Sequence, residues 1–143
     1  MSDHIDQMKS LHTTVVDARN GYEEALKDAE GKGLTPLFRD MIALHQTHAD
    51  ALAADLARHG EHVDDEGSFL STIHRTVMSV RALFGGLDES VLPGLIDGEE
   101  RVIGYYDEAL ASCPPGELAT LSQQRAALQA KVEQMKARKT LAA

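Results

Sequence analysis

Apolar residues recur at intervals of three and four along several long stretches, and no stretch alternates polar and apolar residues long enough to form a strand. Intervals of three and four place side chains on one face of an α-helix, whereas a half-buried strand needs an interval of two. The sequence therefore predicts an all-α fold in which each helix buries one face. The clearest such face comprises Leu34, Phe38, Met41, His45, His48, Leu52 and Leu56.

Glycine and proline divide the periodic stretches into five predicted helices. Gly31, Gly33 and Pro36 separate the first two helices, and Gly60 ends the second. A shorter third helix is expected from about Ser68 to Phe84, and the segment SCPPGE separates the fourth helix from the fifth. The order predicted for a single domain over residues 1–143 is a helical hairpin, a short crossover helix and a second helical hairpin.

Four stretches carry a family resemblance in this order: NGYEEAL, GSFLSTIHRTVMSVRALFGG, DGEERVIGYYDEAL and CPPGEL. Together they span roughly Asp3 to Arg138, and the chain resembles a small bacterial family of four-helix-bundle proteins of unknown function within the ferritin-like superfamily. The family pattern has a Trp in the crossover helix where this chain has Val77. The resemblance implies a ferritin-like four-helix bundle and suggests a stress-associated role.

Three polar residues lie on predicted core faces and form the candidate metal site. His45 and His48 are one helical turn apart on the second helix, and Glu99 lies on the apolar face of the fourth. Helix rise places His48 and Glu99 at similar depths. Imidazole and carboxylate groups suit iron, manganese or zinc.

A complete two-metal centre is not expected, because such centres take a Glu from each of two helices and a Glu-x-x-His motif from each of two others. The fifth helix instead has Arg125 on its predicted core face, which comprises Leu118, Leu121, Arg125, Leu128, Val132 and Met135. Three alternatives stay open at this point. One is a closed polar network of Glu99, Arg125, His45 and His48; the second is a partial metal site; the third places the histidines at the bundle edge or at a subunit contact.

Composition narrows the range of partners. The net charge of −9 and a pI near 5.1 leave no basic surface to bind nucleic acid or an anionic membrane. The single cysteine, Cys113, excludes an internal disulfide and is expected to be a half-buried residue at a helix end. The first residues lack a signal-peptide pattern, so a cytoplasmic location is expected.

These observations favour a non-enzymatic bacterial bundle protein with a buried polar layer, self-associating as a homo-oligomer, with a dimer favoured. One alternative is a ferritin-like metalloprotein that uses His45, His48 and Glu99, and any enzymatic activity would then be that of a metal-dependent oxidase. Another alternative is a helical module that binds a partner or a second copy of itself. No catalytic residue is nominated.

Overall fold

The computed structural model describes residues 2–29, 34–63 and 92–142, and these residues form four helices and no strand. The helices are α1 (Ser2–Ala29), α2 (Thr35–Arg58), α4 (Leu92–Ala111) and α5 (Pro115–Ala142). The expected all-α architecture is therefore confirmed for the described residues. The predicted crossover helix, including Val77, lies outside them.

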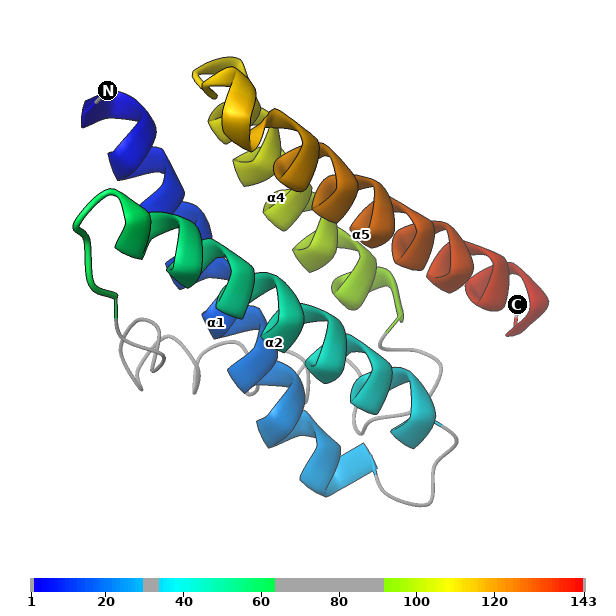
Figure 1. Ribbon diagram of the computed structural model, residues 1–143. Coiled ribbons are helices and arrows are strands. Elements are labelled where there is room, and N and C mark those ends of the chain that lie inside the picture. The colour runs from blue at the N-terminus through cyan, green and yellow to red at the C-terminus, as the bar shows by residue number, and fades with distance from the viewer. Residues whose placement is uncertain (1, 30–33, 64–91, 143) are drawn as a thin grey trace.

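The four helices form two antiparallel hairpins, α1 with α2 and α4 with α5 (Figure 1), and α1 also packs against α4. His4 near the start of α1 contacts Glu117 near the start of α5, and His59 at the end of α2 contacts the same carboxylate. We call this end of the bundle the His4 end. Since α2 ends there and α4 begins at the opposite end, the helix order matches a bundle with one long crossover connection.

Local sequence explains where α2 begins and ends. Pro36 stands in its first turn, where the missing backbone N–H costs no hydrogen bond. At the other end Gly60 adopts a φ of +80°, a left-handed conformation that glycine reaches without steric cost. This turn ends the helix and places His59 as its C-terminal capping residue.

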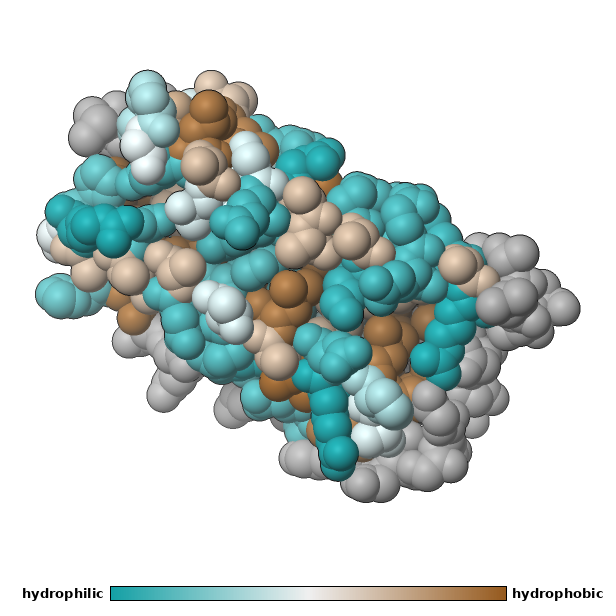
Figure 2. Space-filling view, turned by 45° about the vertical axis from the view of Figure 1, so that its right-hand side comes forward, coloured by the Kyte–Doolittle hydropathy of each residue, from teal (hydrophilic) through white to brown (hydrophobic). Residues whose placement is uncertain are grey.

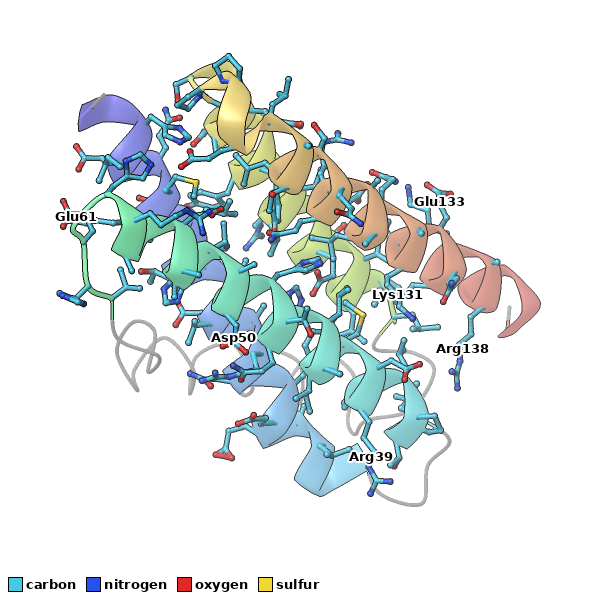
Figure 3. The ribbon with its side chains drawn as sticks, in the orientation of Figure 1. Arg39, Asp50, Glu61, Lys131, Glu133 and Arg138 are labelled. Atoms are coloured by element: carbon cyan, nitrogen blue, oxygen red, sulfur yellow. The ribbon has the colours of Figure 1, made fainter. Side chains whose placement is uncertain are left out.

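The core is mainly aliphatic and follows the predicted helix faces most closely on α2. All seven residues of the predicted α2 face are buried, including His45 and His48. Most of the face shown in Figure 2 is hydrophilic, with smaller apolar areas between, and the charged side chains labelled in Figure 3 lie around the outside of the bundle. Within the described ranges, no helix is both long and apolar enough to cross a membrane.

The prediction for α5 is wrong at two of its six positions, because in the first half of the helix the buried face is rotated by one residue at these places. Leu118 is 48% exposed and Arg125 is half-buried, whereas Glu117 and Gln124 are buried. Gln124 and Arg125 lie three and four residues after Leu121, so the helical interval alone allows either of them to be buried. Polar contacts explain the observed one, since Gln124 and Glu117 both accept hydrogen bonds from groups inside the bundle.

Two leucines on α5 provide a test of this rotation. Leu121→Ala removes a fully buried side chain and is expected to lower the free energy of unfolding by about 2–5 kcal/mol. Leu118→Ala, made in the exposed position, is expected to change it by less than about 0.5 kcal/mol. Urea unfolding followed by circular dichroism measures both values. Equal losses in the two variants would contradict the register of α5.

Candidate functional site

The first part of the core polar layer is centred on the carboxylate of Glu99, which is 2% exposed. Its Oε1 accepts a hydrogen bond from the Tyr22 hydroxyl at 2.9 Å and lies 3.0 Å from His45 Nε2. The Tyr22 ring stacks near that of His45 and packs edge-on against Phe38. We call Tyr22, His45 and Glu99 the Glu99 group, and it joins α1, α2 and α4.

The second part joins α2, α4 and α5, and we call it the Tyr106 group. The Tyr106 hydroxyl donates to Gln124 Oε1 at 2.7 Å and lies 3.3 Å from His48 Nδ1. Since a phenol has one proton to donate, the His48 Nδ1–H must donate to the Tyr106 oxygen. A neutral His48 ring then keeps its lone pair on Nε2, a nitrogen with which histidine commonly binds metals.

Burial sets the protonation states in this layer. Burial is the main cause that raises the pKa values of Tyr22 and Tyr106, and the negative charge of Glu99 adds to it. Both hydroxyls therefore stay protonated and act as hydrogen-bond donors. Burial, followed by the nearby His45, lowers the pKa of His48 to about 4, although Glu99 acts in the opposite direction. His48 is therefore neutral near pH 7.

Two polar atoms of the Glu99 group have no hydrogen-bond partner among the described residues. They are Glu99 Oε2 and His45 Nδ1, both fully enclosed. A buried carboxylate oxygen without a partner costs at least about 1–3 kcal/mol, so it calls for a compensating group. Glu99 and Tyr22 also line a cavity of about 370 Å³ between α1 and α4, whose wall includes Gly21 and Gly98.

The structure brings together some of the residues expected at the site. Glu99 and His45 are in contact, and His48 lies on the next turn of α2 but binds Tyr106. The predicted place of Arg125 in a closed network is wrong. Its guanidinium instead pairs with Asp107, with Nε 2.6 Å from Oδ1, on the partly exposed side of α5.

The donor set does not fit the two-metal centre of ferritin-like enzymes. Around the polar layer, α1 contributes Tyr22 and α5 contributes Gln124, where that centre would need carboxylates. Glu99 is the carboxylate that the described helices place in this layer. The described residues of this layer therefore provide no second metal position beside Glu99.

Sequence reasoning did not identify Gln124 as a member of the layer. The sequence feature that could have identified Gln124 is its position three residues after Leu121. This interval is as typical of a core face as the four-residue interval from Leu121 to Arg125. Tyr106, the partner of Gln124, stands seven residues after Glu99, two helical turns along the same apolar face of the fourth helix. Together these two residues indicate that the layer extends from Glu99 toward the His4 end.

The depressed pKa of His48 makes stability depend on pH. An unfolded chain protonates this imidazole below pH 6.5, while the folded protein does so only near pH 4. The unfolded state is therefore favoured as pH falls through this window, and the group contributes nothing above it. As pH falls from 6.5 to 4, the free energy of unfolding of the wild type is expected to decrease by up to about 3 kcal/mol more than that of His48→Gln.

Urea unfolding at several pH values across the window measures this difference. His62→Gln is the matched control, because His62 is an exposed histidine near the end of the same helix. The control should follow the wild-type curve. A His48→Gln curve parallel to the wild type would contradict a buried neutral His48.

The comparisons with known proteins identify one family. The profile of a family described as a domain of unknown function (DUF2383) matches residues 3–112. No curated protein and no solved structure matches the chain significantly. The matched range contains α1, α2, α4 and the whole Glu99 group, and it ends before α5. Because the match covers well over half of its length, the chain belongs to this family of unknown function, DUF2383.

Proposed function

We propose that this chain is a ferritin-like, non-catalytic bundle protein that holds one divalent transition-metal ion in its core. Glu99 and His45 supply the first two ligands. His48 would supply the third after its side chain turns, because the ligand atoms of these three residues do not all lie within 4.8 Å of one another in this structure. The observation that carries the proposal is the unpartnered oxygen Oε2 of the buried Glu99 carboxylate. A cation bound there would satisfy this oxygen and balance its charge in an apolar setting.

The ferritin-like part of the proposal is supported by helix order. The two hairpins run antiparallel, and α2 ends at the opposite end of the bundle from the start of α4. Ferritin-like folds have this connectivity, with one long crossover between two hairpins. The family to which the chain belongs does not itself assign a function.

The geometry of the Glu99 group is compatible with one ion. His45 Nε2 and Glu99 Oε1 are 3.0 Å apart. Two neighbouring ligands that each bind an ion at about 2.1 Å lie roughly 3 Å from one another, so an ion between this carboxylate and Nε2 fits the spacing. The ion would replace the hydrogen bond between Nε2 and Oε1, with the ring proton moving to Nδ1. Neutral His48 adds no positive charge that would repel the cation. The cavity beside Glu99 offers a path from the surface.

The number of metal ligands in the layer favours retention of one metal ion over a redox reaction. The layer has one carboxylate, and the helices described provide no ligand set for a second ion beside it. Carboxylate and imidazole donors without sulfur accept Mn²⁺ and Fe²⁺ as well as Zn²⁺. We therefore expect retention of a single ion, without oxidase activity above that of the free metal.

Metal content tests the proposal. Protein purified without chelator and reconstituted with Mn²⁺ or Fe²⁺ is expected to hold about one equivalent by elemental mass spectrometry. Glu99→Gln and His45→Gln should reduce this to background, and His48→Leu should weaken retention. Glu100→Gln is the control, because Glu100 is the neighbouring carboxylate and lies on the exposed side, facing Lys136.

Circular dichroism keeps the test interpretable by showing which variants remain folded. A folded Glu99→Gln protein that retains as much Mn²⁺ and Fe²⁺ as the wild type would refute the proposal. So would a wild-type protein with no metal above background. In that case the layer is a purely structural polar network.

A further inference from the structure

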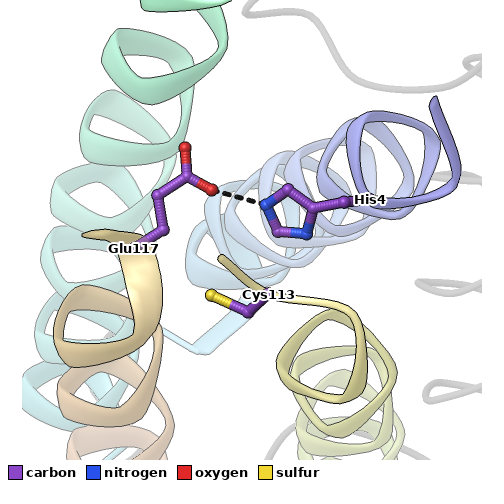
Figure 4. Close-up of side chains that lie close together, drawn as sticks. All are labelled: His4, Cys113 and Glu117. Atoms are coloured by element: carbon purple, nitrogen blue, oxygen red, sulfur yellow. Dashed lines mark hydrogen bonds and ion pairs between the residues drawn. The ribbon is translucent and has the colours of Figure 1, made fainter. Parts of the chain in front are cut away.

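A second cluster of residues that could bind a metal lies at the His4 end of the bundle, and it shares no residue with the Glu99 group. It comprises His4 from the start of α1, Cys113 from the link between α4 and α5, and Glu117 from the first turn of α5 (Figure 4). Their ligand atoms all lie within 4.8 Å of one another. In the part of the chain that the structure describes, no other set of three His, Cys, Asp or Glu side chains brings its ligand atoms this close together.

The carboxylate of Glu117 is held from both sides. His4 Nε2 lies 2.5 Å from Oε2, and His59 Nε2 lies 2.6 Å from Oε1. Burial alone would raise the pKa of Glu117, but the hydrogen bonds from His59 and His4 outweigh it and lower this pKa. Glu117 is therefore ionised near pH 7, and its orientation is fixed by His59.

His4 carries an unsatisfied group at this point. Its side chain is 3% exposed, and its Nδ1 is enclosed without a hydrogen-bond partner. A neutral imidazole that donates one N–H to Glu117 keeps a lone pair on its other nitrogen. The two ring nitrogens point in diverging directions, so the atom that can share an ion with Glu117 is Nε2, 2.5 Å from Oε2. It becomes a ligand when its proton moves to Nδ1.

Cys113 contributes the third donor atom. The thiol is half-buried and lies 3.1 Å from the Pro114 carbonyl oxygen, to which it donates. Burial and then the charge of Glu117 raise the pKa of Cys113, so without a cation the thiol stays protonated near pH 7. A divalent metal reverses this preference, because it binds the thiolate and displaces the proton.

We propose that His4, Cys113 and Glu117 form a second metal site, selective for Zn²⁺ or a metal of similar softness, which ties the two hairpins together at one end. A thiolate, an imidazole and a carboxylate are typical zinc ligands, whereas Mg²⁺, Ca²⁺ and Mn²⁺ prefer oxygen donors. The thiolate and the carboxylate together balance the charge of the ion. One proton, that of the Cys113 thiol, is released to solvent for each ion bound.

His59 acts as a positioning residue in this site. Its hydrogen bond to Oε1 holds the Glu117 side chain while Oε2 faces His4. Partners of this kind orient metal-binding carboxylates, and their loss typically weakens affinity about 10–100-fold. His59→Gln should therefore weaken Zn²⁺ binding without abolishing it.

Thiol chemistry and spectroscopy test the site independently of the Glu99 group. Alkylation of Cys113 in the folded protein is expected to slow at least about tenfold when Zn²⁺ is bound, because the thiolate is then engaged. Co²⁺ should give a thiolate-to-metal charge-transfer band in the wild type and in Glu99→Gln. The band should be lost in Cys113→Ser and strongly reduced in His4→Gln.

His62→Gln serves as the control, since it removes an exposed histidine near the same end of the bundle. It should leave the band and the alkylation rates unchanged. In the Glu99→Gln protein, Zn²⁺ should also raise the thermal midpoint, and adding Cys113→Ser to this variant should remove the increase. Alkylation of the wild type at the same rate with and without Zn²⁺, or a charge-transfer band that persists in Cys113→Ser, would overturn the proposal.

Discussion

The buried carboxylate of Glu99 constrains the rest of this bundle. A carboxylate removed from water is strongly destabilising unless polar groups replace its hydration, and here Tyr22 and His45 do so from two other helices. The geometry of three helices is therefore fixed at one height. Apolar packing tolerates small sliding movements, whereas hydrogen bonds of 2.9 and 3.0 Å do not. Glu99 thus specifies how the second hairpin sits against the first.

Five polar contacts inside the bundle share a further property, which is that each joins one hairpin to the other. His45 and Tyr22 reach Glu99, His48 reaches Tyr106, and at the far end His4 and His59 reach Glu117. Of the five side chains that the first hairpin contributes to these contacts, four are histidines. An imidazole can donate and accept at once, so it can satisfy a partner in the opposite hairpin and still offer a second atom. Docking of the hairpins is therefore selective for one register.

The sequence predicted α2 well and α5 less well, for a physical reason. On α2 the apolar residues leave one possible face, and it is buried throughout. On α5 the intervals from Leu121 allowed Arg125 or Gln124, and a contact with Tyr106 on another helix decided between them. His4 was missed although it stands four residues before Met8, in step with the core face of α1. Its partner Glu117 is far away in sequence, so no local pattern could pair the two.

Three side chains that join the hairpins also carry a buried atom without a hydrogen-bond partner. Glu99 Oε2, His45 Nδ1 and His4 Nδ1 are enclosed without partners, and each belongs to a contact between hairpins. A ligand that binds the folded form and not the unfolded one stabilises the folded form by mass action. Cations bound by these side chains would therefore strengthen the association of the two hairpins, and the net charge of −9 favours their approach. Metal binding at either proposed site would thus be coupled to the association of the hairpins. The core oxygen and nitrogen donors would accept Mn²⁺, Fe²⁺ or Zn²⁺, and the sulfur-containing cluster at the His4 end would favour Zn²⁺.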